Sequence, residues 1–307
     1  MKIDKTDSIE EVLKKLEEGV RALYDSETYK AYLDFLSKFH NYSYSNALLI
    51  FLQKSDATLC AGYKTWEKMG RHVNKGETGI RIIAPVQYKR EVESQVVDAQ
   101  TGEAKTDAEG NPIREKKVVK SQSFRMVSIF DVSQTSGAEL PSLGVDELTG
   151  DVEDYETIID TICRIAPVPV TFDDIQGGAK GYYSLSEKRI VVQKGMSEEQ
   201  TIKTLVHEWA HSLLHDKDGG SIEGVEQDRK LSRNAREVEA ESISYCVCRK
   251  LFGFDTGEYS FSYVTSWSQG KELKELGESL DVIAKTSAWM MERVGEEMKQ
   301  CGGMVEF

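Results

Sequence analysis

The sequence contains no apolar run long enough to cross a membrane. No stretch approaches roughly 18 consecutive apolar residues. The N-terminus, Met1-Lys2-Ile3-Asp4, begins with charged residues rather than with an apolar segment. We therefore expect neither a membrane span nor a signal peptide in this chain.

Cysteine is also scarce, and its five copies are scattered along the chain. The odd number and the wide spacing argue against a disulfide framework. Cys246 and Cys248 are two positions apart on an expected helix, so they face different ways and cannot form a tight metal-binding pair. The pattern is typical of reduced thiols in a cytoplasmic protein.

The sequence does have enough apolar residues to fold. Hydrophobic residues make up 39% of the 307 residues and aromatic residues 9%, which is sufficient for a substantial core and excludes a disordered chain. A chain of this length suits two domains. Its formal net charge of −13 is unevenly distributed, because residues 1–140 hold 21 basic and 21 acidic residues. The whole negative excess therefore lies after residue 140.

The most informative stretch is His207-Glu208-Trp209-Ala210-His211. On a helix, residues i and i+4 share one face about 6 Å apart, so two imidazoles can bind one metal ion. This is the H-E-x-x-H arrangement of zinc hydrolases, in which the glutamate is the base that acts on a water molecule. Apolar residues recur at helical spacing through the stretch, which predicts a helix packed on a core. The alternative is a surface helix with scattered polar residues.

A zinc site of this kind needs a third protein ligand. His215 lies eight residues after His207, about 12 Å along a continuous helix, and one ion cannot reach both. No glycine between His211 and His215 would allow the chain to reverse. We therefore expect His215 to be a helix-surface residue or a group behind the ligands.

A second helix is expected from Arg236 to a glycine stop at Gly253, and it places Glu237 and Glu241 on one face. Two carboxylates four residues apart repel each other unless each has a partner, such as a metal ion or a ligating histidine. This pattern resembles the gluzincin metallopeptidases. The resemblance implies that Glu237 is the third zinc ligand and that Glu241 accepts a hydrogen bond from a histidine ring. The alternative is an acidic, solvated helix face.

The N-terminal half alternates between helical and strand patterns. Apolar spacing predicts two helices within residues 7–40, a third that Ser43 or Ser45 caps, and a short one from Trp66 to Met69. Strands are expected at Val73, at residues 80–86 and at residues 124–132, with a turn at residues 74–77 joining the first two. Residues 91–120 are charged and contain turn signals, so they are expected to form an exposed extension.

Basic charge is concentrated in residues 38–90, which hold nine basic residues against three acidic ones. Aromatic residues alternate with these basic residues. The same combination occurs in grooves that bind single-stranded nucleic acid, where aromatic rings stack on the nucleobases and basic side chains contact the phosphates. The alternative is that the aromatics belong to the core and that the basic residues form a solvated face. The candidate contacts are Tyr44, Tyr63, Lys64, Trp66, Lys68, Arg71 and Lys75.

Three blocks of this half resemble the N-terminal domain of ArdC-type antirestriction proteins. The first block is Tyr42-Ser43-Tyr44-Ser45-Asn46-Ala47-Leu48-Leu49-Ile50. The second consists of Ala61-Gly62-Tyr63-Lys64-Thr65-Trp66, Gly70-Arg71 and Val73-Asn74-Lys75-Gly76-Glu77-Thr78-Gly79-Ile80, and the third is Ile129-Phe130-Asp131-Val132-Ser133-Gln134-Thr135-Ser136-Gly137. The resemblance implies an α+β protein in which a single-stranded-DNA-binding domain with helices and a β-hairpin precedes a zincin-like metallopeptidase domain. It also implies a protein of a mobile element that protects incoming DNA from restriction enzymes.

On this basis we expect a first domain at residues 1–140, a linker at 141–152 and a peptidase domain at 153–307, with Zn²⁺ as cofactor. By resemblance to zincins, the strand at 188–192 would form the upper edge of the cleft and bind an extended peptide. Two other functions remain open. The zinc domain could be catalytically silent in a DNA-binding protein, or the chain could be a regulatory peptidase similar to the ImmA family, which cleaves a repressor.

Overall fold

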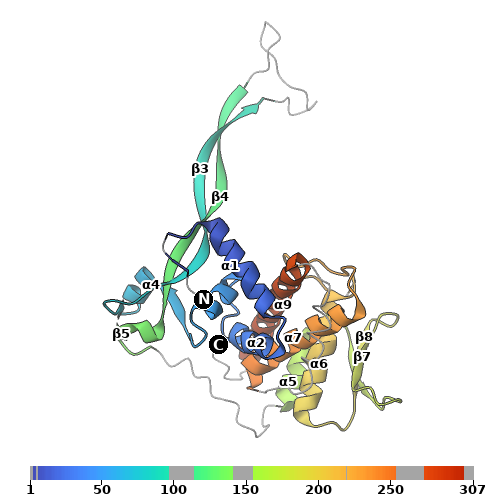
Figure 1. Ribbon diagram of the computed structural model, residues 1–307. Coiled ribbons are helices and arrows are strands. Elements are labelled where there is room, and N and C mark those ends of the chain that lie inside the picture. Colours follow the sequence, from blue (N-terminus) through green and yellow to red (C-terminus); the bar gives the residue numbers. More distant parts are fainter. Residues whose placement is uncertain are drawn as a thin grey trace.

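The structure is a computed structural model. It describes residues 3–4, 6–96, 114–140, 155–218, 220–253 and 273–300. The expected linker at 141–152 and the tip of the expected extension, residues 97–113, lie outside the described residues. Both helices and strands are present (Figure 1), so the predicted α+β class is confirmed. None of the described helices is long and apolar enough to span a bilayer.

The N-terminal half begins with three helices, as the apolar spacing predicts. These are α1 (Ile9–Ala22), α2 (Ser26–Lys38) and α3 (Tyr44–Gln53). Each starts at a polar residue whose side chain accepts a hydrogen bond from the backbone three residues on, namely Ser8, Asp25 and Ser43. A short helix, α4 (Tyr63–Lys68), follows strand β1 (Cys60–Gly62).

The strands of this half form two small sheets. One has the order β1-β4-β3, with β3 at Ile80–Gln95 and β4 at Arg114–Asp131, and the other pairs β2 (Arg71–Val73) with β5 (Thr135–Gly137). The predicted strands at Val73 and residues 80–86 therefore exist, but they belong to different sheets. The reason is the 3-10 turn η1 (Val132–Gln134), which turns the chain after β4 so that β5 pairs with β2.

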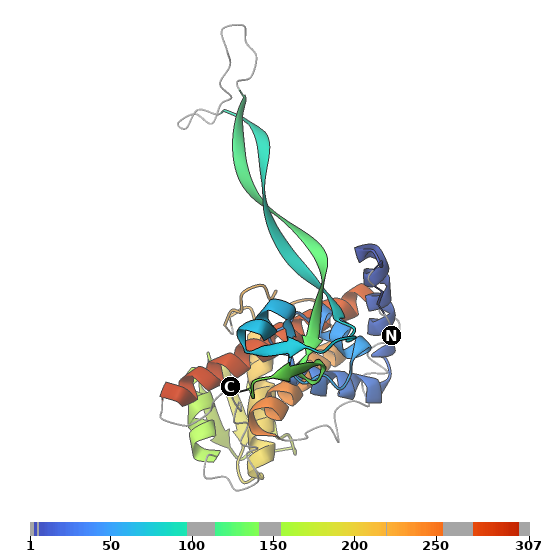
Figure 2. The same ribbon diagram turned by 90° about the vertical axis from the view of Figure 1, so that its left-hand side faces the viewer.

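Strands β3 and β4 form a long two-stranded ribbon that continues beyond the sheet. Their pairing is unbroken from Ile80 opposite Ile129 to Gln95 opposite Arg114. In both views the ribbon projects away from the helices (Figures 1 and 2). Residues 91–95 and 114–120 of the expected extension belong to the two strands of this ribbon, and residue 96 follows the first strand directly.

The C-terminal half places helices against a three-stranded sheet. The sheet has the order β6-β8-β7, from Val170–Asp173, Arg189–Gln193 and Gly181–Ser184. The helices are α5 (Tyr155–Ile165), α6 (Glu198–Leu214), α7 (Arg233–Phe252) and α9 (Leu273–Gln300). Helix α6 contacts β7 and β8 on one side and α7 on the other, so it lies between the sheet and the remaining helices.

The two halves share one hydrophobic core. Helix α2 packs on α7, while α1 and α3 pack on α9. Polar contacts cross this boundary as well, because the Tyr29 hydroxyl lies 2.8 Å from Ser242 Oγ and the Tyr245 hydroxyl donates to Asp34 Oδ1 at 2.8 Å. The N-terminal helices therefore support α7, one of the two helices that build the site described next.

Candidate metal centre

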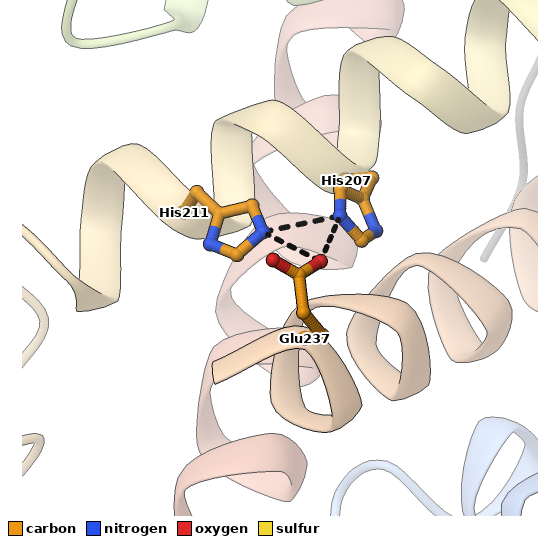
Figure 3. A group of neighbouring side chains, drawn as sticks. All are labelled: His207, His211 and Glu237. Atoms are coloured by element: carbon orange, nitrogen blue, oxygen red, sulfur yellow. Dashed lines mark hydrogen bonds and ion pairs between the residues drawn. The ribbon is translucent and has the colours of Figure 1, made fainter. Parts of the chain in front are cut away.

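Helix α6 presents the two motif histidines at its polar edge. Ser197 caps the helix by accepting a hydrogen bond from the backbone of Gln200. The predicted apolar stripe is buried, with Trp209 fully enclosed in the core. This packing fixes the rotation of the helix, so that His207 and His211 face α7 across the edge of the core (Figure 3).

Three possible metal donors meet between α6 and α7. The Nε2 atoms of His207 and His211 lie 3.1 Å apart, and Glu237 Oε2 lies 3.5 Å from the first and 3.6 Å from the second. Donors of a tetrahedral zinc ion, each about 2 Å from the metal, lie about 3.3 Å from one another. The triangle in Figure 3 therefore has the size that one metal ion requires, and these three residues could hold one.

Glu241 lies behind this triangle, one helical turn from Glu237. Its Oε2 is 3.1 Å from the outer nitrogen of His207, Nδ1, and its Oε1 is 2.6 Å from Lys203 Nζ. A carboxylate in this position keeps the proton of the histidine on Nδ1 and leaves Nε2 free to bind a metal. The geometry thus supports Glu237 as the inner carboxylate and Glu241 as the outer one.

His215 lies behind the second histidine. Helix α6 ends at Leu214, and His215 is its buried C-terminal cap, with Nδ1 2.7 Å from Nδ1 of His211. On its other side, His215 Nε2 is 3.6 Å from Glu239, a fully buried carboxylate that also accepts hydrogen bonds from Arg229. His215 therefore lies behind the donor triangle and is not a surface residue, which matches one of the two positions expected for it.

The pKa values of these groups follow from burial and close pairing. Burial lowers the pKa of His207, but the hydrogen bonds to Glu237 and Glu241 outweigh it and raise the value to about 9. Hydrogen bonds from His207 and His211 hold the pKa of Glu237 far below its ordinary value. Burial lowers the pKa of His215, so this imidazole is neutral at pH 7. Negative charge on the carboxylates is thus favoured, as a cation site requires.

Glu208 faces the same space as the donor triangle. Burial raises the pKa of Glu208 above its ordinary value. A Cβ atom at Gly181 on β7 would come within 2.6 Å of Thr204 Cγ2 and 3.3 Å of Glu208 Cγ, so a glycine is needed for the strand to pass this close. A buried carboxyl with a raised pKa is suited to accept and return a proton near neutral pH.

A cleft of about 510 Å³ opens over these residues. Its far wall is strand β7, the edge of the sheet, whereas β8 lies in the middle between β6 and β7. The expectation that the strand at 188–192 forms the upper edge of the cleft is therefore wrong. The reason is that β8 is paired on both sides, in parallel with β6 and antiparallel with β7, so the unpaired strand edge at the cleft belongs to β7.

Two family models match separate parts of the chain. Residues 5–130 match the N-terminal domain of anti-restriction factor ArdC, and residues 163–263 match the IrrE N-terminal-like domain of the M78 peptidases. This chain is an ArdC-type two-domain protein. The IrrE-like match contains both motif histidines and Glu237.

Among curated proteins, the ArdC-type chain is 25% identical to an uncharacterized protein of Bacillus anthracis, over 94% of the chain and 52% of that protein. It is 27% identical to DNA primase TraC of Escherichia coli, over 72% of the chain and 15% of the primase. The chain thus spans about half the length of the first relative and a small part of the second.

Two crystal structures of the antirestriction ArdC protein from the R388 plasmid are also similar. The metal-free structure has a TM-score of 0.49 and 19% identity, covering 84% of this chain and 86% of that one. The Mn(II)-bound structure has a TM-score of 0.49 and 17% identity, covering 95% and 98%.

The candidate nucleic-acid residues of the ArdC-type N-terminal domain fall into two groups. The exposed group lies on and after α4 and comprises Tyr63, Lys64, Lys68 and Lys75. The other three are engaged in the fold. Tyr44 is half-buried against α9, and Arg71 uses its guanidinium to bind the Thr135 carbonyl and hydroxyl and the Ala138 carbonyl.

Trp66 corrects the sequence-based expectation. Its ring is completely buried and its Nε1 donates to the Phe130 carbonyl at 2.9 Å, which ties α4 to β4. A ring with no exposed face cannot stack on a base. Sequence alone did not separate this core aromatic from the exposed Tyr63, because both lie in the same short helix.

Sequence reasoning also missed the partners of His215. Arg229 lies in the irregular segment before α7, and Glu239 lies on α7 between Glu237 and Glu241, which share a different face of the helix. A glutamate on an expected helix with an arginine ten residues upstream was the available signal. It is a weak one, since such pairs are common on solvated faces.

Proposed function

We propose that this ArdC-type protein is a zinc-dependent peptidase that also binds single-stranded DNA and acts in antirestriction. The observation that carries the peptidase half is the meeting of His207, His211 and Glu237 beside the buried Glu208. Two imidazoles and one carboxylate form the ligand set that leaves a position open for substrate or water. The match of residues 163–263 to the IrrE-like domain supports the same proposal.

The donor set suits zinc among the divalent ions. Neutral imidazole nitrogens favour zinc over calcium or magnesium, which prefer oxygen ligands. A zinc ion held there would polarise a substrate carbonyl and acidify a water molecule. Glu241 and His215 hold the two imidazoles with their Nε2 atoms inward, so that both can act as ligands.

Glu208 is the proposed proton carrier. Its carboxylate would take a proton from the attacking water and return it to the leaving amine of the cleaved peptide. The raised pKa of Glu208 brings it nearer to neutral pH, where both steps must occur. An extended peptide would lie along β7, whose free edge offers main-chain hydrogen bonds over the cleft.

The decisive experiment compares Glu208→Gln with wild type. Each protein is loaded with zinc, the bound metal is measured by mass spectrometry, and hydrolysis is followed with casein and a quenched-fluorescence peptide library. We expect the variant to keep its zinc and lose hydrolysis, because the amide cannot carry the proton. Glu199→Gln, an exposed change on the same helix, is the matched control. Loss of zinc in Glu208→Gln, or unchanged cleavage, would contradict the role.

The DNA-binding half of the proposal is supported by the matched ArdC N-terminal domain and by the exposed residues around α4. Tyr63 offers a ring that is 50% exposed, with Lys64, Lys68 and Lys75 nearby in sequence to follow phosphates. Replacing the three lysines by glutamine should weaken binding of a labelled single strand of about 20 nucleotides and reduce its salt dependence. Unchanged affinity would remove this surface from the proposal.

Two other functions share part of this support. A DNA-binding protein with a silent metal domain would keep antirestriction activity in Glu208→Gln, whereas a peptidase that acts in antirestriction would lose it. The IrrE-like match also favours a regulatory peptidase that cleaves a repressor. That function does not need the exposed lysines on and after α4, so it would survive their replacement.

A further inference from the structure

The middle of the β3–β4 ribbon carries a band of positive charge without a single acid. The band comprises residues 84–90 of β3 and 119–125 of β4, which we call the cationic band. It contains Lys89, Arg90, Lys120 and Arg125, all exposed, in a chain whose net charge is −13. Tyr88 and Phe124 lie among them with 44% and 56% of their surface exposed.

The cations of the band differ from those nearer the tip. Arg114, Lys116 and Lys117 each have an acidic partner on the ribbon: Glu93 at 3.8 Å, Glu91 at 3.9 Å and Glu115 at 2.5 Å. Within the described part of the chain, the four cations of the band have no ion-pair partner. The cations near the tip of the ribbon are thus neutralised by neighbouring acidic residues, whereas the four cations of the band are available to bind an anionic ligand.

Two of these cations lie directly opposite each other. Lys89 pairs with Lys120 in the strand register, so both ammonium groups project from one face of the ribbon. Like charges directly opposite on a β-pair destabilise it. An anion bound between them would remove that repulsion.

The band is charged on both faces of the ribbon. Because side chains alternate along a strand, Lys89, Lys120 and Phe124 share one face, while Arg90, Arg125 and Tyr88 share the other. A single strand lying on one face would meet only two of the four cations. A ribbon that enters the groove of a duplex has a phosphate backbone on each side and can use all four.

We propose that the cationic band binds double-helical nucleic acid by entering its major groove. A two-stranded ribbon fits this groove, which is about 12 Å wide in B-form DNA. The ribbon projects from the body in both views, so a duplex can approach the band from either side (Figures 1 and 2).

This inference goes beyond the proposed function, because it adds a duplex site apart from the α4 surface. The test uses the full-length protein and three variants. The first replaces Lys89, Arg90, Lys120 and Arg125 by glutamine. The second replaces the paired cations Arg114, Lys116 and Lys117 by glutamine, as a control of similar charge on the same ribbon. The third replaces Lys64, Lys68 and Lys75 on the α4 surface.

Binding of a labelled duplex of about 20 base pairs, and of one of its strands, is measured by anisotropy over a range of salt concentrations. We expect the first variant to bind the duplex at least about tenfold more weakly. Its slope of log affinity against log salt should fall by about 3 to 4, since each phosphate contact contributes about 0.9. Its affinity for the single strand should stay at the wild-type value.

The control variant should keep wild-type affinity for the duplex, and the α4 variant should lose affinity for the single strand alone. The inference is overturned if wild type does not bind the duplex, if the first variant binds it normally, or if the control variant loses as much affinity. Single-strand binding without duplex binding would overturn this inference and leave the proposed function standing. Circular dichroism of each variant verifies that the fold is retained.

Discussion

The Nδ1 atoms of His211 and His215 lie 2.7 Å apart, so one of them donates a hydrogen bond and the other accepts it. If His211 is to bind a metal through Nε2, its proton must be on Nδ1, and His215 must be the acceptor. The proton of His215 is then on Nε2, which faces the buried Glu239. Arg229 balances the negative charge of Glu239. With these proton positions, each contact in the series from Arg229 through Glu239 and His215 to His211 pairs a donor with an acceptor.

We therefore predict that His215→Ala weakens metal binding without removing a ligand. Loss of an outer hydrogen-bond partner of a metal ligand costs about 10- to 100-fold in affinity. Zinc affinity is measured by competition with a chromophoric chelator. His215→Asn, which restores an acceptor at this position, should recover part of the affinity. Equal affinity in wild type and His215→Ala would show that His211 does not depend on this contact.

Removal of the metal should lower the thermal stability of the whole chain. A ligand that binds only the folded state stabilises it by about 2.7 kcal/mol at 100 times its dissociation constant. Treatment with EDTA should therefore lower the Tm, and added zinc should restore it. In Glu237→Gln the same treatment should change the Tm far less, because one donor of the triangle is weakened. A Tm that does not respond to EDTA in zinc-loaded wild type would contradict the site.

The positions of the central residues follow from local spacing, whereas their surroundings do not. His207 and His211 share a face because a helix places i and i+4 together, and the motif itself identifies Glu208. The end of α6 at Leu214 has no glycine signal. It depends on Asp228 and Gln227, which donate to the carbonyls of Leu214 and Leu213 from a distant segment. Such tertiary contacts decide that His215 points inward.

The same limit applies to the N-terminal domain. Tyr63 and Trp66 lie in one helix of six residues, and only the packing against β4 shows that one is exposed and the other buried. Strand β2 likewise pairs with β5, more than sixty residues away, instead of with its neighbour β3. Periodicity identifies elements, but it does not identify partners that are distant in sequence.

Asp131 should make the stability of this domain sensitive to acid. The residue is 1% exposed, and its carboxylate accepts hydrogen bonds from the Ser133 hydroxyl and from the backbones of Thr58, Leu59 and Ser133. Burial raises the pKa of Asp131, but these bonds outweigh it and lower the pKa below 3.8. The stability that Asp131 contributes is therefore complete above pH 3.8 and is lost as the pH falls from there toward the lower folded-state value.

Asp131→Asn should lower the free energy of unfolding by about 2 kcal/mol at pH 7, the usual cost of losing hydrogen bonds to a buried charge. Urea unfolding at pH 7 and near pH 3 measures the difference, which should shrink at the lower pH as wild type becomes protonated. Asp56→Asn is the control, because that side chain is 78% exposed in its ion pair with Lys54. A pH-independent difference for Asp131→Asn would argue against a role for its charge.

The shared core predicts that residues 1–140 do not form an independent folding unit, although the family match ends near that boundary. Tyr29 and Leu33 on α2 are fully buried, and the hydroxyl of Tyr29 meets Ser242 of α7. Without α7 and α9, this face of the three helices would be exposed to water, at a cost of about 25 cal/mol for each Å² of apolar surface. An isolated 1–140 fragment should therefore bind a hydrophobic dye and unfold at a lower temperature than the full chain.

Within the full chain, Tyr29→Phe should lower the free energy of unfolding by about 1 kcal/mol, because it removes one buried hydrogen bond. Ser242→Ala should add little to this loss in the double variant, because both changes remove the same contact. A fragment with the Tm of the full chain, together with additive losses in the double variant, would instead mean that the two halves fold separately and that helices α6 and α7 do not depend on the N-terminal half.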